Sequence, residues 1–212
     1  MLEKIHADAN FSDLIIWSDE ASFNLSGTVN RRNSIFWALE NPHRKLVKKM
    51  KSQSICVLAG ISSLGVFGPF FFPNTVTGAS FLKVMQEEMM PEIAAKHDLE
   101  TCWFQLDGAP GHWAKVVRDW LNATFPRRWI GRGGPLRWPP RRPDLTPPDF
   151  FLWGYIKDKT YAQKPSTLVE LQNAIKTAFL EIPVSMCQRA CQSVSGRFSK
   201  CLEANGGQIH SS

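Results

Sequence analysis

Two aspartates follow short apolar runs and could together bind a divalent metal ion. Asp19 closes the run LIIWSD, and Asp107 closes the run CWFQLD. If the two runs form neighbouring parallel strands, their ends lie about 5 Å apart, so both carboxylates could reach one metal cluster. Acids at strand ends are also common turn and capping residues, so the spacing leaves a structural role open. The pattern does not choose between Asp19 and Glu20 either, because adjacent side chains on a strand point to opposite faces.

The segment WPPRRPDLTPPDFF supplies two further acids, Asp144 and Asp149. Its TPPD motif predicts a helix with Thr146 as N-cap and Pro147 at the first helical position. Asp149 then stands at the third position, where its carboxylate can accept a hydrogen bond from the N-cap amide. Asp144 suits an Asx turn that leads into this helix. Both acids therefore have a structural explanation, and the residues alone do not require either of them to bind metal.

The motif DGAPGH, which begins at Asp107, predicts a tight turn and then a helix that starts near His112. Free backbone amides at a helix N-terminus favour anions such as phosphate. His112 could therefore contact a phosphate or a metal-bound water, and an ordinary role at a helix start is equally compatible. Apolar side chains then recur at helical spacing, at Trp113, Val116, Val117, Trp120 and Leu121.

Positive charge is concentrated in one segment of the chain. The formal net charge is +6, and no acid lies between Asp119 and Asp144. Arginines interleaved with Trp129 and Trp138 are suited to phosphate contact and to stacking on a nucleic acid strand. A solvated basic loop is the alternative interpretation. The six arginines of this segment are Arg127, Arg128, Arg132, Arg137, Arg141 and Arg142.

The remaining pattern places most strands before most helices, the order of a mixed α/β domain. Strands are expected at 13–20, 22–26, 34–39, 55–62, 65–72 and 101–107, of which 55–62 and 65–72 form a hairpin. Helices are expected at 81–93 with a kink at Pro91, from His112, from about Pro147, and in two later segments. Thr167 and Glu170 form a possible capping box for the first of these two, and Gly206-Gly207 ends the second.

The composition fits one well-buried domain over residues 1–212. Hydrophobic residues make up 43% of the chain and charged residues 21%. The longest apolar run, at 65–72, is too short to cross a bilayer, and the N-terminus lacks the apolar core of a signal peptide. We therefore expect a soluble, intracellular protein. The five cysteines show no metal-type pairing, and we expect reduced thiols in the core.

Several separated motifs, in the same order, resemble the catalytic part of mariner-type DNA transposases. These proteins belong to the three-carboxylate transposase and integrase superfamily, which has a ribonuclease H-like fold. The resemblance implies a mixed sheet flanked by helices, with extra C-terminal helices. The motifs are WSDEASFNLSGTVNRRN, FQLDGAPGHWAKVVRDWLN, WPPRRPDLTPPDFFLWGYIK and CLEANGGQIH.

The resemblance also implies a set of site residues. The aspartate of the SDE motif matches Asp19 rather than Glu20, that of DGAPxH matches Asp107, and the last acid of PDLxPxD matches Asp149. Asp144 matches the structural aspartate of that last motif. By this resemblance the three acids would be catalytic and would hold two Mg²⁺ or Mn²⁺ ions for in-line attack on a phosphodiester.

The expected partner is DNA, as transposon ends and target, in contact with the six arginines and His112. A homodimer and a nuclear location are further expectations from the family, whereas a membrane or a small-molecule cofactor is not expected. Helix-turn-helix modules, which precede the catalytic part in full-length relatives, are not recognisable here. A catalytically silent or domesticated remnant that binds DNA or a protein is therefore the main alternative, and a hydrolase of RNA–DNA hybrids is the third.

Overall fold

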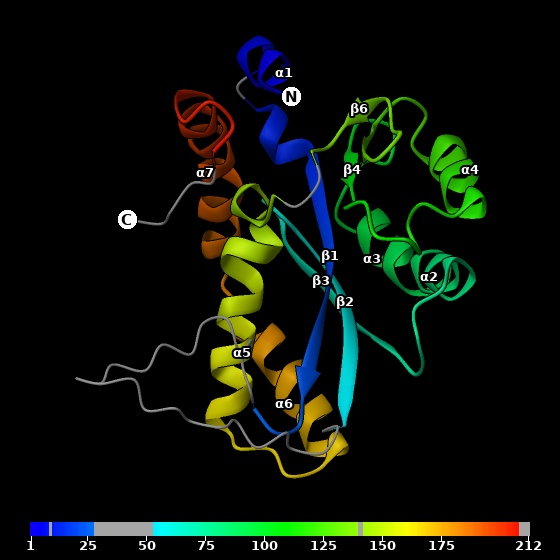
Figure 1. Cartoon of the computed structure of the whole chain (residues 1–212), viewed down its shortest axis with the longest axis vertical. Coiled ribbons are helices and arrows are strands. Elements are labelled where there is room, and N and C mark those ends of the chain that lie inside the picture. Colours follow the sequence, from blue (N-terminus) through cyan, green and yellow to red (C-terminus); the bar gives the residue numbers. More distant parts are fainter. Residues whose placement is uncertain (9, 28–52, 140–141, 208–212) are drawn as a thin grey trace, which may run out of the picture.

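A six-stranded mixed sheet forms the centre of the molecule (Figure 1). The computed structural model describes residues 1–8, 10–27, 53–139 and 142–207. The strand order is β3-β2-β1-β4-β5-β6; β1, β2 and β3 are antiparallel neighbours, whereas β4, β5 and β6 continue from β1 in parallel. The strands are β1 (Ile15–Asn24), β2 (Ser54–Ser62), β3 (Gly65–Phe72), β4 (Trp103–Gln105), β5 (Trp129–Gly131) and β6 (Leu136–Arg137).

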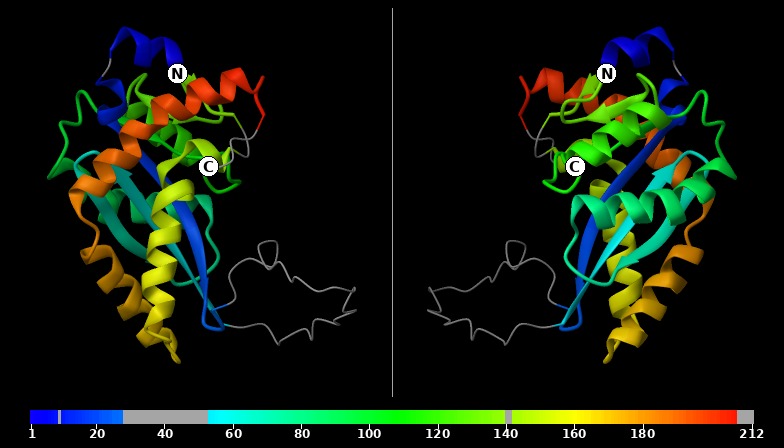
Figure 2. Two further views of the ribbon diagram at one scale, coloured as in Figure 1. Left: turned by 90° about the vertical axis from the view of Figure 1, so that its left-hand side faces the viewer. Right: turned by 90° about the vertical axis from the view of Figure 1, so that its right-hand side faces the viewer.

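Helices cover both faces of the sheet. Figure 2 shows α5, α6 and α7 on one side of the strands and α2, α3 and α4 on the other. The α-helices are α1 (Leu2–Ala7), α2 (Gly78–Val84), α3 (Met90–Ala94), α4 (Lys115–Thr124), α5 (Trp153–Ala162), α6 (Leu168–Leu180) and α7 (Val184–Glu203). Shorter helical turns are η1 (Phe11–Leu14), η3 (Met85–Met89), η4 (Pro143–Leu145) and η5 (Pro148–Leu152). No described helix is long and apolar enough to span a membrane.

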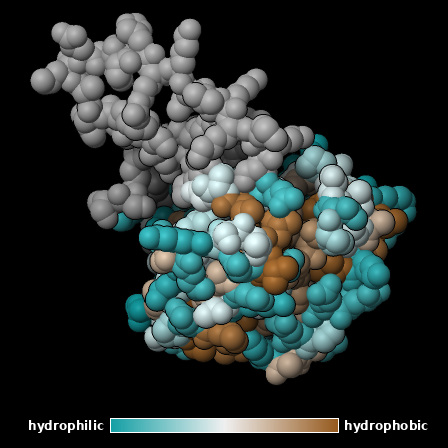
Figure 3. Space-filling model, turned by 90° about the horizontal axis from the view of Figure 1, so that it is seen from below, coloured by the Kyte–Doolittle hydropathy of each residue, from teal (hydrophilic) through white to brown (hydrophobic). Residues whose placement is uncertain are grey.

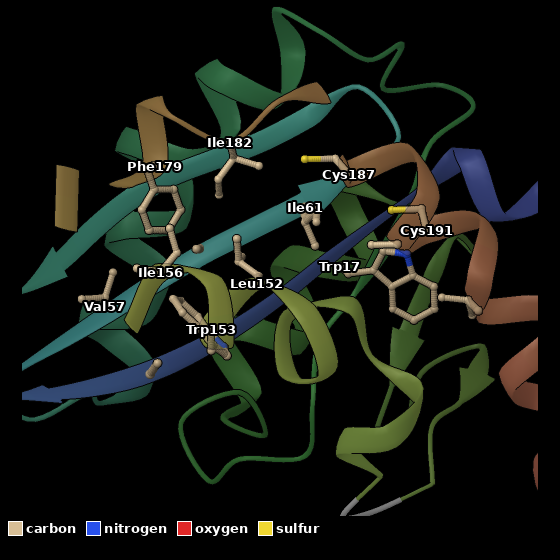
Figure 4. Close-up of a cluster of buried hydrophobic side chains, with 14 of the residues drawn as sticks. Trp17, Val57, Ile61, Leu152, Trp153, Ile156, Phe179, Ile182, Cys187 and Cys191 are labelled. Atoms are coloured by element: carbon tan, nitrogen blue, oxygen red, sulfur yellow. The ribbon is translucent and has the colours of Figure 1, made fainter. Parts of the chain in front are cut away.

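The strand β1 serves two cores because its side chains alternate between the two faces. Trp17 and Phe23 belong to the core beneath α5–α7, whereas Ile16 belongs to the core beneath α2–α4. Figure 4 shows part of the first of these cores, where Trp17 of β1 lies beside Cys191 of α7. The ring of Trp153 of α5 packs edge-on against that of Phe23. By this alternation Asp19 lies on the α5–α7 face of β1, and Glu20 lies on the opposite face.

The expectation that the first strand stops at its acids was wrong. β1 continues through Asp19 and Glu20 to Asn24, because β2 pairs with it along this whole stretch and Phe23 extends the buried face. The predicted strand at 22–26 is therefore mostly the second half of β1. The predicted strand at 34–39 lies outside the described residues. The predicted hairpin of 55–62 and 65–72 is confirmed as β2 and β3.

The helix predicted at 81–93 is interrupted ahead of Pro91 rather than simply kinked. The π-helical turn η3 separates α2 from α3, and Pro91 lies in the first turn of α3. Proline has no amide hydrogen and its ring clashes with the carbonyl four residues before it. A wider turn at this point relieves both conflicts.

The C-terminal helices follow the predicted pattern closely. The buried face of α7 is the predicted one, and the five cysteines are free thiols. α7 ends at Glu203, and the Gly206 amide then donates to the Cys201 carbonyl at 2.9 Å with Gly206 at φ +82°. At the start of α6 the Thr167 hydroxyl accepts the Glu170 amide, but the Glu170 carboxylate accepts from Ser166 instead of completing a capping box.

The surface seen from below is largely hydrophilic. Figure 3 shows hydrophobic patches near the middle of this face, interrupted by hydrophilic residues. Large exposed apolar side chains of the described chain include Leu180, which is 88% exposed, and Val169, which is 67% exposed.

Candidate active site

One pocket brings together the three acids whose motifs are spread over the sequence. Asp19, Asp107 and Asp149 all line a cavity of about 810 Å³. The pairing of the parallel strands β1 and β4 explains the first two, because its last register pair is Trp17 with Gln105. Asp19 and Asp107 each lie two positions beyond that pair, and both line the pocket. The turn η5 supplies Asp149 from the other side of the pocket.

Asp19 is held in place by a tryptophan of the helix layer. The Trp153 Nε1 of α5 donates to Asp19 Oδ2 at 2.7 Å. Burial raises the pKa of Asp19 well above its usual range, and the negative charges of Asp149, Glu20 and Asp107 raise it further. The hydrogen bond from Trp153 opposes this shift only in part. Burial and the neighbouring carboxylates therefore both favour the protonated form of Asp19.

Asp149 is oriented by the residue that was expected to cap its helix. The Thr146 hydroxyl donates to Asp149 Oδ2 at 2.5 Å, whereas the Thr146 carbonyl accepts the amides of Asp149 and Phe150. As predicted, Thr146 precedes the helix and Pro147 is its first helical residue, followed by η5 from Pro148. Asp149, however, bonds the hydroxyl of Thr146 rather than its amide. Burial and the charge of Asp107 raise the pKa of Asp149, which the Thr146 hydrogen bond and Lys157 partly offset.

Asp107 is tied into a chain of three side chains. Its Oδ1 atom accepts from the Ala109 amide at 2.9 Å and from His112 Nδ1 at 2.7 Å. The other ring nitrogen, His112 Nε2, lies 2.6 Å from Glu20 Oε1. Burial opposes protonation of His112, yet its bonds to Asp107 and Glu20 raise its pKa to about 10, so that both ring nitrogens donate. Burial alone would raise the pKa of Asp107, but the bond and charge of His112 lower it below its usual value.

The expectations for His112 need correction. The helix predicted to start there begins at Lys115 as α4, and His112 lies in the preceding turn, where its amide donates to the Ala109 carbonyl. From this turn the side chain of His112 lies between Glu20 and Asp107. The histidine is only 4% exposed, and both ring nitrogens are engaged, so it offers no nitrogen to a DNA phosphate.

Comparison with known proteins relates the whole chain to transposases. The chain is 28% identical to the transposable element Tc1 transposase of Caenorhabditis elegans over 204 residues, which cover 90% of this chain and 68% of that protein. It is 27% identical over 203 residues to the Tcb1 transposase of Caenorhabditis briggsae, with the same coverage of 90% and 68%. The chain is homologous to the Tc1/mariner transposases. No protein-family model matches it.

Solved structures give the same answer for the fold of this Tc1/mariner homologue. The Mos1 transposase in its paired-end complex with the left transposon end matches with a TM-score of 0.75 at 19% identity, over 99% of this chain and 60% of that one. The Mos1 catalytic domain bound to raltegravir and Mn matches with a TM-score of 0.68 at 18% identity, over 99% of this chain and 90% of that domain. The predicted ribonuclease H-like mixed sheet flanked by helices is thereby confirmed. The chain spans about 60% of the length of the Mos1 chain in the paired-end complex.

Asp144 has a different environment from Asp19, Asp107 and Asp149. The Arg142 guanidinium donates to both of its carboxylate oxygens, at 2.9 and 2.7 Å, and Arg197 Nη1 donates to its carbonyl at 3.0 Å. Arg142 also donates to the Gly206 carbonyl at 2.9 Å and to Cys201 Sγ at 2.9 Å. This network ties the loop before Asp149 to the end of α7, a structural role.

The arginines expected to bind DNA divide into two groups. Arg128 and Arg142 are used internally, because Arg128 Nη1 donates to the Leu99 carbonyl at 2.6 Å and to the Cys102 carbonyl at 2.8 Å. Arg132 is exposed, lines the pocket and lies 4.8 Å from the Trp113 ring centroid. Arg127 and Arg137 are exposed, and Arg141 lies outside the described residues.

Sequence reasoning missed the partners that orient the three acids. Trp153 gave no signal, because a core tryptophan and a donor to Asp19 look alike in sequence. The pairing of Glu20 with His112 depends on contact between residues 92 positions apart. The link from Arg142 to Asp144 could have been found, because an arginine two residues before an aspartate can form a local ion pair.

Proposed function

We propose that this chain is the catalytic part of a Tc1/mariner-type transposase and that it cleaves and joins DNA strands with the help of divalent metal ions. The observation that carries this proposal is the convergence of Asp19, Asp107 and Asp149 on one pocket. Their motifs are separated by up to 130 residues along the chain, 149 − 19, and homology to transposases makes a common chemical role the simplest reason for their convergence.

The chemistry of the three acids fits Mg²⁺ or Mn²⁺. All three supply carboxylate oxygens, which these hard cations prefer. Burial, and after it repulsion between the carboxylates, raises the pKa of Asp19 and of Asp149, and positive charge in the pocket would relieve that repulsion. The Mos1 catalytic domain has been solved with raltegravir and Mn and with raltegravir and Mg. We propose two such ions for this chain.

A second group of possible ligands is a weaker candidate for these ions. Ligand atoms of Glu20, Asp107 and His112 lie within 4.8 Å of one another. With a pKa of about 10, His112 would first have to lose a proton at neutral pH. His112 therefore supplies positive charge beside Asp107 rather than a free lone pair for a metal.

The residues around the pocket would have two roles: the three aspartates would bind the cations, and their hydrogen-bond partners would orient the carboxylates. Bound at Asp19, Asp107 and Asp149, the cations would supply Lewis-acid stabilisation of phosphoryl oxygens and a more acidic water or 3′-hydroxyl. Trp153 and Thr146 fix the carboxylates of Asp19 and Asp149 before substrate arrives. Preorganised ligands of this kind need no rearrangement during the reaction.

DNA would approach from the side of the exposed arginines. Arg132 reaches the pocket and could hold a backbone phosphate beside the acids, with Arg127, Arg137 and Arg141 extending the contact. Mos1 transposase has been solved as a paired-end complex, so we also propose for this chain a dimer that acts on two DNA ends. A nuclear location would follow from a chromosomal substrate.

Nicking of supercoiled plasmid DNA tests the proposal. Wild-type protein is expected to nick with Mn²⁺ or Mg²⁺ and to be inactive in EDTA. The Asp149→Asn variant should lose at least about 100-fold in rate, the order of loss when a charge-stabilising group is removed from an active site. Asp158→Asn is the matched control, since Asp158 is an exposed acid of α5 outside the pocket.

The same assays distinguish a catalytically silent domain and a hydrolase of RNA–DNA hybrids from a transposase. Salt-sensitive DNA binding without metal-dependent nicking by the wild-type protein would favour a catalytically silent domain. Equal nicking by wild type and Asp149→Asn would contradict the assignment of Asp149. Faster cleavage of an RNA–DNA hybrid than of a DNA duplex would favour a hydrolase of hybrids.

A further inference from the structure

Glu20 lies next to Asp19 on β1 but serves a different group. Its side chain is on the opposite face of the strand, where Oε1 lies 2.6 Å from His112 Nε2. The sheet permits this contact because β4 ends at Gln105 while β1 continues, so the sheet is open beside Glu20. A glutamate from one face thereby reaches a histidine that binds Asp107.

The packing around His112 leaves its ring little freedom. The side chain is 3% exposed, and the ring of Phe81 from α2 lies 4.2 Å away between centroids. Two hydrogen bonds, at 2.6 and 2.7 Å, fix the ring nitrogens between carboxylates. A ring held at both nitrogens and on one face can set the direction of the carboxylate that it contacts.

Two hydrogen-bond donors fix the carboxylate of Asp107. Both of its hydrogen bonds, from the Ala109 amide and from His112 Nδ1, go to the same oxygen, Oδ1. The carboxylate plane is therefore fixed by two donors on one side. The residue also lines the pocket that holds Asp19 and Asp149.

We infer that Glu20 and His112 form a positioning pair that sets the orientation of Asp107 for cation binding, with Glu20 reaching Asp107 through His112. This inference rests on the proposed function of the pocket. It also explains why the SDE motif carries two adjacent acids here: Asp19 faces the cations, and Glu20 holds the histidine that aligns the second ligand. Neither Glu20 nor His112 is a metal ligand in this account.

Calorimetric titration of the full chain with Mn²⁺ provides a test that does not depend on nicking. His112→Leu fills similar space without a donor and should weaken Mn²⁺ binding by about 10–100-fold, the usual loss when a partner behind a metal ligand is removed. His112→Asn can place an amide N–H near the position of Nδ1 and should recover most of the affinity. Glu20→Ala leaves the bond from His112 to Asp107 in place and should weaken binding by about tenfold.

A second histidine offers a matched control. His97 Nε2 lies 2.8 Å from Ser62 Oγ, and its ring lies 5.9 Å from that of Phe67, remote from the pocket. His97→Leu should leave the affinity for Mn²⁺ unchanged even if it lowers thermal stability. Circular dichroism establishes that each variant is folded, and Glu20→Ala still tests the inference if His112→Leu does not fold.

The outcomes separate the positioning role from the proposed function. Folded His112→Leu and Glu20→Ala proteins that bind Mn²⁺ within about threefold of wild type would overturn the positioning role, and the function would stand. Failure of His112→Asn to bind more tightly than His112→Leu would also contradict it, because the restored donor is the basis of the role. Wild-type protein that binds no Mn²⁺ would overturn the proposed function and the positioning role together.

Discussion

Replacement of Asp149 by asparagine separates a metal ligand from a helix-capping residue. Asparagine keeps an oxygen that can accept the Thr146 hydroxyl, so the local hydrogen bond survives while the charge is lost. In the metal-free protein, this change removes one partner of the repulsion that helps to raise the pKa of Asp19. The metal-free variant is therefore expected to be at least as stable as wild type.

Bound Mn²⁺ should change the thermal stability of wild type more than the Asp149→Asn substitution changes that of the metal-free protein. A ligand at 100 times its Kd stabilises a folded protein by about 2.7 kcal/mol. In a chain of 212 residues, each kcal/mol raises Tm by about 2–4 °C, so Mn²⁺ should raise the Tm of wild type by roughly 5–10 °C. The same Mn²⁺ concentration should raise the Tm of Asp149→Asn by less than about 2 °C, since a lost ligand lowers affinity and so the linked stabilisation.

Thermal unfolding followed by fluorescence, with EDTA or with Mn²⁺, measures both quantities. If Asp149 is mainly a capping residue, the metal-free variant should be less stable by about 0.5–1 kcal/mol, and its response to Mn²⁺ should equal that of wild type. That pair of results would refute the reasoning. Asp158→Asn, the control on α5, should match wild type under both conditions.

Three further substitutions test the basic segment and the loop before Asp149. Arg142→Leu removes both hydrogen bonds to the Asp144 carboxylate and should lower the free energy of unfolding, measured by urea titration, by about 3 kcal/mol. A loss below about 1 kcal/mol would contradict the structural role of this ion pair. Arg132→Ala should weaken DNA binding and reduce the slope of log K against log salt by about 1, whereas an unchanged slope would exclude a phosphate contact. Arg128→Ala should instead lower stability by about 1–3 kcal/mol and leave that slope unchanged, because its guanidinium bonds the carbonyls of Leu99 and Cys102.

Local patterns in the sequence predicted the fold well where burial repeats regularly. The face of α7 and the hairpin of β2 and β3 follow directly from helical and alternating periodicity. The end of β1 was not predictable in this way. Its partner β2 continues alongside Asp19 and Glu20, and a pairing between distant segments outweighs the usual preference of acids for strand ends.

The three acids of the site could be selected by family resemblance, but their supports could not. Trp153 and Thr146 contact Asp19 and Asp149 only in the folded chain. Arg128 was expected to bind DNA because a run of arginines has the composition of a nucleic-acid-binding loop. Its guanidinium instead satisfies two carbonyls near the start of β4, which composition does not reveal.

The central claim concerns which carboxylates bind the cations. Anomalous scattering from a crystal of the chain grown with Mn²⁺ locates the metal directly. The account predicts Mn²⁺ ligated by oxygens of Asp19, Asp107 and Asp149, with His112 still bonded to Asp107. Mn²⁺ bound instead by Glu20 and His112, with Asp19 and Asp149 outside its ligand shell, would contradict it.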